Sequence, residues 1–235
     1  MAATLTIQGL EVRYGDTVAL TGVDLELPAG SSLAVIGPNG SGKSTLLNAI
    51  AGINPPFAGT ISWGGEAPAL VLQSTSVDRS LPITVRDTIG LGRYPRLGLL
   101  RRFNGNDGGA VAQAMAQLDI TDLAGEQLHD LSGGQRQRVL VAQGLAQQSD
   151  LLLLDEPVTG LDVTSRGLIL DVIHDEVTRG NSVIVTTHDL DDARIATRCS
   201  WSIVTPSPSA HRITSSPKII FSIPSAAASS RSVIA

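Results

Sequence analysis

Nine consecutive residues, GPNGSGKST at 37–45, have the composition of a loop that binds phosphate. They follow the apolar run LAVI and precede a helical pattern, which is the context that the G-x-x-x-x-G-K-[ST] motif requires. Glycines let the backbone turn so that successive N–H groups point at phosphate oxygens, and a helix N-terminus adds a positive field. Lys43 supplies a full positive charge for the β- and γ-phosphates, and the Ser44 hydroxyl is a predicted Mg²⁺ ligand. The predicted nucleotide-binding residues of this phosphate loop are Gly37, Pro38, Asn39, Gly40, Ser41, Gly42, Lys43, Ser44 and Thr45.

A second group of chemically capable side chains follows the apolar run LLLL at 151–154, where Asp155 and Glu156 stand next to each other. Asp155 at the tip of a strand would hold Mg²⁺ through water, and Glu156 would polarise the water that attacks the γ-phosphate. Two acids at a strand end can also be a solvated terminus without further function. The phosphate loop upstream favours the catalytic interpretation.

The sequence TTHD at 186–189 ends another apolar run and contributes one imidazole, that of His188. A neutral imidazole can hydrogen-bond a γ-phosphate oxygen or hold the water-activating carboxylate in place. A single histidine at a strand end is more often structural, but the position of His188 after a third apolar strand favours a role at the nucleotide. Glu156 and His188 are therefore predicted catalytic residues.

A fourth motif, LSGGQRQR at 131–138, places one serine and two glycines at the start of a predicted long helix. Helix N-termini of this kind bind anions, yet the phosphate loop already supplies one phosphate cradle. The second cradle would suit the γ-phosphate of a nucleotide bound on another subunit. Its predicted contacts are Ser132, Gly133, Gly134 and Gln135.

Hydrophobic periodicity predicts the elements that position these groups. Three apolar runs, 32–36, 151–155 and 183–187, have no polar face, which is typical of central parallel strands covered by helices on both sides. The segment from about 74 to 148 has little strand character and predicts a helical insertion on that sheet. We therefore predict an α/β fold with a mostly parallel central sheet. Further strands are expected at about 4–12, 18–27 and 69–72, and helices at 43–52, 109–118, 133–148 and 164–179.

The composition narrows the class of protein. The chain has 235 residues, a formal net charge of −5 and one cysteine, Cys199, so it can build its own core and cannot form an internal disulfide. A pI near 5.3 does not favour general nucleic-acid binding. Because it has neither eighteen consecutive apolar residues nor the regions of a signal peptide, the chain is expected neither to span a membrane nor to be secreted.

With LSGGQ between the phosphate loop and LLLLDEP, the sequence resembles the ATP-binding subunits of ABC transporters over about residues 4–192. The resemblance implies a P-loop NTPase of the ABC-ATPase type, with N-terminal antiparallel strands and a helical subdomain at about 74–148, that hydrolyses ATP with Mg²⁺. Tyr14 looks like the aromatic residue that stacks on adenine, Gln73 like the glutamine that senses Mg²⁺ and the membrane partner, and Asp162 like the aspartate that links the two sites of a dimer. The expected metal ligands are Ser44, Gln73 and Asp155, and the expected catalytic residues are Glu156, His188 and Gln73.

The resemblance also implies partners. Subunits of this family form a head-to-tail pair, with two ATP molecules held between the phosphate loop of one chain and the LSGGQ of the other. The transport pathway would be a separate integral membrane permease, as is typical of prokaryotic importers, so the chain is expected at the cytoplasmic face of the cell membrane. An extracytoplasmic metal-binding protein is a further expected partner, and nucleic acid is not.

The transported substrate is suggested by residues 81–103, which resemble the corresponding region of importers for metal ions, manganese and zinc in particular. A more distant similarity is to importers of iron–siderophore complexes and cobalamin. Four arginines give this region a local positive charge within an acidic domain. They could face a coupling helix of the permease or lipid headgroups, or form a solvated basic face. These arginines are Arg93, Arg96, Arg101 and Arg102.

Two other classes of function remain as alternatives. A non-transport ABC-type ATPase of DNA repair or translation would normally show a long coiled coil between its half-motifs, or two cassettes in one chain, and the sequence has neither. A binding module without hydrolysis would be expected to lack the acid that polarises water, and Glu156 argues against it.

The composition changes near residue 193, which divides the chain into a predicted ATPase domain at 1–192 and a tail at 193–235. The tail has no glycine and no acidic residue, whereas it has eleven serines. One hypothesis is a shift of the reading frame near residues 193–200, and the other is a natural Ser/Pro-rich disordered extension. The first hypothesis requires that another reading frame of the gene encodes a hairpin with Gly and Asp at this place. The second hypothesis does not.

Overall fold

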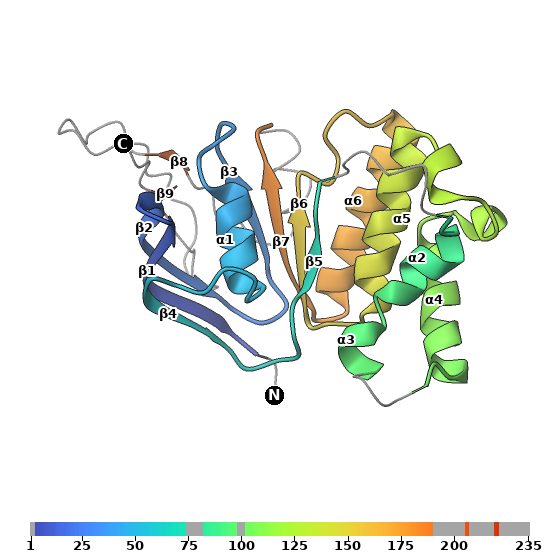
Figure 1. Cartoon of the computed structure of the whole chain (residues 1–235), viewed down its shortest axis with the longest axis horizontal. Coiled ribbons are helices and arrows are strands. Elements are labelled where there is room, and N and C mark those ends of the chain that lie inside the picture. Colours follow the sequence, from blue (N-terminus) through green and yellow to red (C-terminus); the bar gives the residue numbers. More distant parts are fainter. Residues whose placement is uncertain (1–2, 74–81, 98–101, 190–204, 207–218, 221–235) are drawn as a thin grey trace.

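Figure 1 shows the computed structural model of the chain, which describes residues 3–73, 82–97, 102–189, 205–206 and 219–220. From left to right, the figure shows an antiparallel sheet, one helix, a parallel sheet and a group of helices. The antiparallel sheet has the order β2-β1-β4, with β1 at Leu5–Tyr14, β2 at Thr17–Leu27 and β4 at Ala58–Trp63. The parallel sheet has the order β3-β7-β6-β5, with β3 at Ser32–Ile36, β5 at Ala69–Val71, β6 at Leu151–Asp155 and β7 at Ser182–Thr187.

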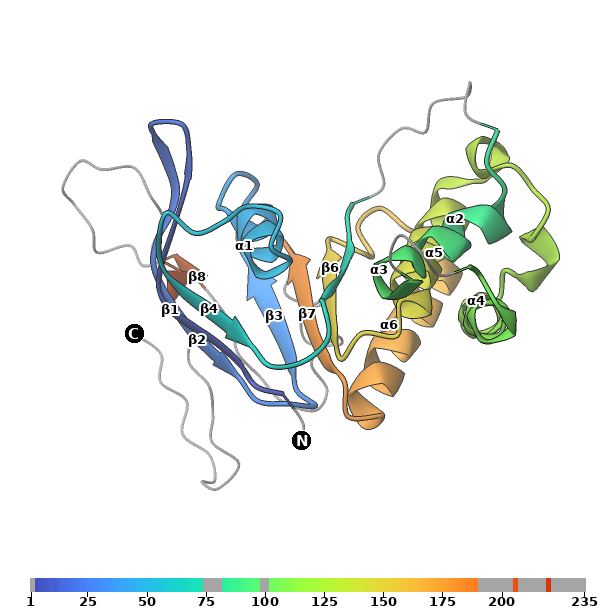
Figure 2. The ribbon, with the colours of Figure 1, turned by 60° about the horizontal axis from the view of Figure 1, so that its bottom comes forward.

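The helices form two groups. Helix α1 (Lys43–Ile50) packs between the two sheets, and the other α-helices lie on the opposite face of the parallel sheet (Figures 1 and 2). No helix within the described ranges is long and apolar enough to cross a bilayer. The second group consists of α2 (Val85–Leu91), α3 (Tyr94–Leu97), α4 (Gly105–Gln117), α5 (Gly133–Ala146) and α6 (Val163–Thr178), with 3₁₀ turns at Thr121–Leu123 and Leu128–Asp130. A short antiparallel pair joins β8 (Thr205–Pro206) to β9 (Ile219–Ile220).

The parallel sheet is buried on both faces because successive side chains of its strands enter two different cores. Leu151 and Leu153 of β6 pack with α1 and the antiparallel sheet. Leu152 and Leu154 of the same strand pack with the helices of the second group. Each buried leucine contributes roughly 1.5–3 kcal/mol relative to an exposed one, so neither face of the strand can be polar. This is the physical reason why β6 is continuously apolar in the sequence.

The register of the parallel sheet brings the carboxyl ends of its strands to one edge. Ile36, the last residue of β3, pairs with Thr187, the last residue of β7. Asp155, the last residue of β6, pairs with Thr186, and β5 ends beside β6 one residue earlier. The segments that follow β3, β5, β6 and β7 therefore meet at this edge.

The structure confirms the predicted α/β class, the mostly parallel sheet and the N-terminal antiparallel strands. Periodicity does not predict β4, α2 or α3 individually. Strand β4 is exposed or half-buried along its whole length, and α2 and α3 have seven and four residues, which is too short for a helical period to be visible. The tail at 193–235 lies outside the described residues except for β8 and β9, so both hypotheses about it stay predictions.

The predicted basic segment is not a uniform basic surface, because Arg93 is only 6% exposed. Its Nε donates to Oδ1 of Asp107 at 3.0 Å, and its Nη1 donates to the carbonyl oxygen of Ala146 at 2.7 Å and to Oε1 of Gln148 at 3.0 Å. Arg93 thus joins the start of α4 to the end of α5. Its guanidinium lies inside the protein and not on a basic surface.

Arg96 is likewise engaged within the chain. Its Nη2 donates to the carboxylate of Glu66, which lies between β4 and β5, and to the carbonyl oxygen of Gln148 at 2.7 Å. Arg102 is exposed, and Arg101 lies outside the described residues. Arg96 therefore ties the group of helices to the segment between the two sheets.

The variant Arg93→Met keeps the apolar stem of the side chain and removes its donors. Because Asp107 and the end of α5 are buried, we expect the free energy of unfolding to fall by about 3 kcal/mol, measured by urea denaturation. Arg102→Met, at an exposed arginine of the same segment, is the matched control and should change stability by less than about 0.5 kcal/mol. Equal stabilities of the two variants would contradict the structural role of Arg93.

Candidate functional site

The phosphate loop begins where β3 ends and leads into α1. The N–H of Gly37 lies 3.4 Å from the carbonyl oxygen of Thr187, which ties the loop to β7. Gly40 and Gly42 have φ angles of 79° and 93°, in the left-handed region that favours glycine. A Cβ atom at Gly42 would also come within 2.5 Å of the Leu20 side chain. Both backbone conformation and packing therefore require glycine at position 42.

Lys43 is the first residue of α1, and its side chain is 5% exposed. Its Nζ donates to the carbonyl oxygens of Gly37 at 2.8 Å and Pro38 at 3.3 Å. The same atom lies 3.2 Å from Oε1 of Glu156. The cation is thus held against the backbone of the phosphate loop and the carboxylate that follows β6.

Glu156 connects the segments that follow β3, β6 and β7. Its φ angle of 46° is left-handed, and its side chain is 10% exposed. Oε2 lies 3.3 Å from Nδ1 of His188 and accepts a hydrogen bond from the Thr159 hydroxyl at 3.3 Å. Lys43, Glu156 and His188, which were predicted from three separate motifs, are therefore in mutual contact through the Glu156 carboxylate.

Asp155 and Glu156 share one hydrogen-bond partner that sequence reasoning missed. The Thr186 hydroxyl donates to Oδ1 of Asp155 at 2.5 Å and accepts from the Glu156 N–H at 3.0 Å. Asp155 is 6% exposed and Thr186 is fully buried. In the sequence, Thr186 is marked only by its place in the motif TTHD. That motif was singled out because of its histidine.

Tyr14 lies beside the start of α1 and is half exposed. Its hydroxyl lies 3.4 Å from the Thr45 hydroxyl and accepts a hydrogen bond from Nδ2 of Asn54 at 2.7 Å. The phenol is therefore held next to the phosphate loop, and half of the residue stays exposed. Asn54 is a second contact that sequence reasoning missed, since a lone asparagine after a helix carries no distinguishing pattern.

Ser44 and Gln73, the other two predicted metal ligands, are exposed. Ser44 is the second residue of α1, and Gln73 follows β5 at the same edge of the sheet as Asp155. Within the part of the chain that the structure describes, no hydrogen bond joins either side chain to Asp155. Residues 74–81, which follow Gln73, lie outside that part.

The LSGGQ motif at 131–135, termed the signature loop below, begins α5 with a capping box. The Ser132 hydroxyl accepts from the Gln135 N–H at 3.3 Å, and Oε1 of Gln135 accepts from the Ser132 N–H at 2.9 Å. These two side chains satisfy one backbone N–H each. A Cβ atom at Gly133 would meet nothing within 4 Å, so this position is open.

Gly134 packs against Asp162, the residue expected to link two sites. A Cβ atom at Gly134 would come within 2.5 Å of Oδ2 of Asp162 and 2.6 Å of the Ser165 hydroxyl. Asp162 is the N-cap of α6, where its Oδ1 accepts from the Ser165 N–H at 2.8 Å. Hydrogen bonds from the backbone amide and then the hydroxyl of Ser165 hold the pKa of Asp162 below its usual value. The carboxylate is therefore ionised at neutral pH.

The signature loop and the phosphate loop of one chain lie apart. Figures 1 and 2 both place α1 and α5 on opposite sides of β6. Within the described ranges, no hydrogen bond joins residues 131–135 to residues 37–45. The structure thus brings together Lys43, Glu156 and His188, which follow three parallel strands. The signature loop, the second predicted anion-binding site, lies apart from them.

Comparisons with known proteins identify similar chains. The model of the ABC transporter family matches residues 20–159. The manganese transport system ATP-binding protein MntB of Listeria monocytogenes is 37% identical over 192 residues, which cover 79% of this chain and 80% of that protein. The hemin import ATP-binding protein HmuV of Streptomyces coelicolor is 41% identical over 192 residues, which cover 77% of this chain and 68% of that protein.

Solved structures with the same fold include an inward-facing conformation of a metal-chelate type ABC transporter. That chain is 30% identical, with a TM-score of 0.76, and the match covers 86% of this chain and 79% of the other. A second structure, cbiO1 of Clostridium perfringens, is part of the transporter complex cbiONQ. It is 25% identical with a TM-score of 0.71, over 86% of this chain and 85% of that one.

The contact between the signature loop and Asp162 leads to a prediction with a matched control. Gly134→Ala should push Asp162 and Ser165 from the start of α6 and lower the free energy of unfolding by about 1 kcal/mol, measured by urea denaturation. Gly133→Ala, at the adjacent open position, should not lower it. If Gly134→Ala is as stable as Gly133→Ala, the contact does not constrain the loop.

Proposed function

We propose that this chain, which belongs to the ABC transporter family of ATP-binding subunits, powers the import of a divalent metal ion through a separate membrane permease. The chain is an ATPase subunit of an importer. A divalent cargo, manganese or zinc, is supported by the similarity to the manganese system of Listeria monocytogenes. The alternative is an iron complex such as an iron–siderophore complex, which is supported by the similarity to the hemin import protein of Streptomyces coelicolor. Cobalamin has no support from that similarity.

The observation that carries the proposed catalytic roles is the Glu156 carboxylate between Lys43 and His188. In our proposal, Lys43 binds oxygens of the β- and γ-phosphates. One carboxylate oxygen of Glu156 accepts a proton from the attacking water, while the oxygen of that water forms a bond to the γ-phosphorus. The bond from that phosphorus to the β–γ bridging oxygen breaks, and ADP leaves with the electron pair. The contact of 3.3 Å between His188 and Glu156 favours the role in which the imidazole holds the carboxylate.

The predicted Mg²⁺ ligands fit this ion by their chemistry. Ser44, Asp155 and Gln73 offer a hydroxyl, a carboxylate and an amide oxygen, and Mg²⁺ prefers oxygen ligands of these kinds. Asp155 has one oxygen, Oδ1, already engaged by Thr186. We propose that these three side chains hold Mg²⁺ with ATP, where the ion would neutralise charge on the phosphate oxygens.

We further propose that two such subunits pair head to tail. The separation of the signature loop from the phosphate loop supports this arrangement, because the N-terminus of α5 cannot then serve the nucleotide of its own chain. The open position at Gly133 and the exposed Ser132 leave room for a phosphate from a second copy. Tyr14 would stack on the adenine, and Asp162, which touches Gly134, would connect the signature loop of one site to the other site.

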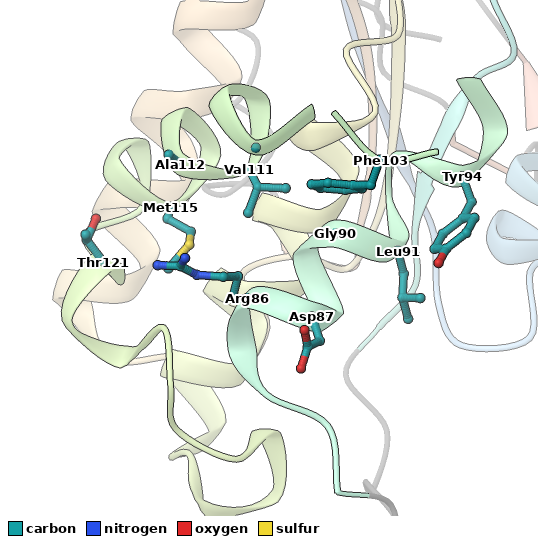
Figure 3. Close-up of a pocket in the computed structure, with 11 residues that line it drawn as sticks. Arg86, Asp87, Gly90, Leu91, Tyr94, Phe103, Val111, Ala112, Met115 and Thr121 are labelled. Atoms are coloured by element: carbon teal, nitrogen blue, oxygen red, sulfur yellow. The ribbon is translucent and has the colours of Figure 1, made fainter. Parts of the chain in front are cut away.

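A pocket among the helices is our candidate surface for the permease. It has a volume of about 460 Å³ and lies between α2 and α4, as Figure 3 shows. Leu91, Tyr94 and Phe103 are between 45% and 60% exposed there, and Arg86 and Asp87 add charges of both signs. An apolar pocket with exposed aromatic side chains and a charged rim is typical of a protein interface.

The remaining parts of the proposal follow from this docking. A subunit that binds a permease in this way would be peripheral at the cytoplasmic face of a prokaryotic cell membrane. Import of a metal ion would also require an extracytoplasmic metal-binding protein that delivers the cargo to the permease.

The catalytic roles are tested by substitution of Glu156 and Lys43. Glu156→Gln removes the base, so we expect ATP hydrolysis to fall by about 10²–10⁴-fold while ATP still binds and holds a closed dimer. Lys43→Ala should instead weaken ATP binding about tenfold or more, because a charge-assisted contact is lost. Hydrolysis, equilibrium binding and light scattering of the ATP-bound protein separate the two effects. Hydrolysis by Glu156→Gln at the wild-type rate would refute the assigned base.

Docking is tested at Leu91, which is 45% exposed and remote from the nucleotide site. Leu91→Glu should leave the ATPase rate of the isolated subunit unchanged and reduce its binding to permease-containing vesicles by about tenfold, because a charge would enter the apolar interface. Leu91→Met keeps the apolar surface and is the matched control. Undiminished binding of Leu91→Glu would mean that the permease docks elsewhere.

A further inference from the structure

We infer that Thr186 is a positioning residue for ATP hydrolysis, whose one hydroxyl orients both Asp155 and Glu156. The inference rests on the proposed roles of these two acids. Thr186 is fully buried in β7, and its backbone pairs with that of Asp155 in the parallel sheet. Its side chain therefore stands directly beside the end of β6, where the chain passes from the strand into the catalytic segment.

The directions of the two hydrogen bonds are fixed by chemistry. The Glu156 N–H can only donate, so the Thr186 oxygen must accept at that contact of 3.0 Å. The single hydroxyl proton of Thr186 is then left for Oδ1 of Asp155, at 2.5 Å. The two contacts polarise each other, since accepting from an amide strengthens the hydroxyl as a donor. One hydroxyl thus fixes which carboxylate oxygen of Asp155 is engaged.

The same hydroxyl holds an uncommon backbone conformation. Glu156 has a φ angle of 46°, which costs free energy for a residue with a Cβ atom and needs support from its surroundings. The hydrogen bond from its N–H to Thr186 supplies that support at the point where the chain turns. The turn directs the Glu156 carboxylate toward Lys43 and His188. Loss of the hydroxyl should therefore displace the base as well as the Asp155 carboxylate.

The fold alone does not require a hydroxyl at this position. Positions 183–185 of the same strand are Val, Ile and Val, and they are buried as completely. Valine has nearly the shape of threonine and a high preference for buried strands. A hydroxyl at 186 instead of a methyl group is thus explained by the two acids beside it, which are the only hydrogen-bond partners of this hydroxyl among the described residues.

The test compares Thr186→Val with Thr186→Ser in the full-length protein. Thr186→Val leaves Asp155 Oδ1 and the Glu156 N–H without their shared partner, and we expect kcat to fall by roughly 10- to 100-fold. Thr186→Ser keeps the hydroxyl and should retain kcat within about threefold. Thr186→Cys, with a weak donor of similar size, should lie between them and replaces Thr186→Val if the valine variant does not fold.

A readout other than turnover addresses Asp155. ADP binding is measured by calorimetry with Mg²⁺ and with a chelator, for the wild type and for Thr186→Val. The factor by which Mg²⁺ increases the affinity for ADP should be about tenfold smaller in the variant than in the wild type. The affinity for ADP without Mg²⁺ should be unchanged. A purely structural role of Thr186 would weaken both measurements alike and would overturn the inference.

The matched control is Ser182→Ala at the other end of β7. Ser182 is as deeply buried, and its hydroxyl accepts from the Gly30 N–H at 3.1 Å, remote from the acids. Ser182→Ala should lower the melting temperature without changing kcat. A kcat of Thr186→Val within twofold of the wild type, or a serine variant as slow as the valine variant, would refute the positioning role.

A double variant separates this inference from the proposed function. The part of the Thr186 effect that acts through Glu156 is lost in Glu156→Gln, so adding Thr186→Val to that variant should reduce hydrolysis by less than it does in the wild type. Full hydrolysis by Glu156→Gln alone would refute the assigned base and with it the proposed function. Slow Glu156→Gln together with fast Thr186→Val would refute only the role of Thr186.

Discussion

A nearly buried carboxylate is the constraint on which the rest of the site depends. Glu156 is only 10% exposed, and an ionised group at that depth is tolerated when opposite charges and hydrogen-bond donors surround it. Lys43 is the first residue of α1, after β3, His188 directly follows β7, and Thr159 lies in the segment after β6. The contacts with Lys43 and His188 require β3 and β7 to end at the same level as β6, so the surroundings of this one side chain depend on the register of the parallel sheet.

The parts that could be predicted from sequence are those in which one residue type has few alternatives. Continuous apolar runs indicate strands buried on both faces, and the structure places 151–155 and 182–187 at the centre of the parallel sheet. The run 32–36 is buried as expected, but it forms the end strand of that sheet and is not central. Glycine at position 42 follows from a left-handed backbone and a neighbouring leucine that leave no room for a Cβ atom. The meeting of Lys43, Glu156 and His188 could be expected because parallel strands end at a common edge.

The parts that could not be predicted depend on contacts between residues that are remote in the sequence. Arg93 belongs to a run of arginines that resembles a basic surface, yet its guanidinium is buried because Asp107 and the end of α5 accept its hydrogen bonds. Asn54 contacts Tyr14 through one hydrogen bond, and Thr186 contacts Asp155 and Glu156 through two. Local sequence has no pattern for any of these contacts. Strand β4 is paired along β1 but largely exposed, so its pairing leaves little trace in hydrophobicity.

The strand order also has a consequence for biosynthesis. β7 follows β3, β5 and β6 in the chain, but it lies between β3 and β6 in the sheet. While the ribosome has not yet released residues 182–188, β3 and β6 therefore lack the neighbour that joins them. The lysine and the acidic pair are made early, but a nascent chain cannot bring them together in this arrangement until β7 has emerged from the exit tunnel. Assembly of the proposed ATP site is in this sense a late event of translation.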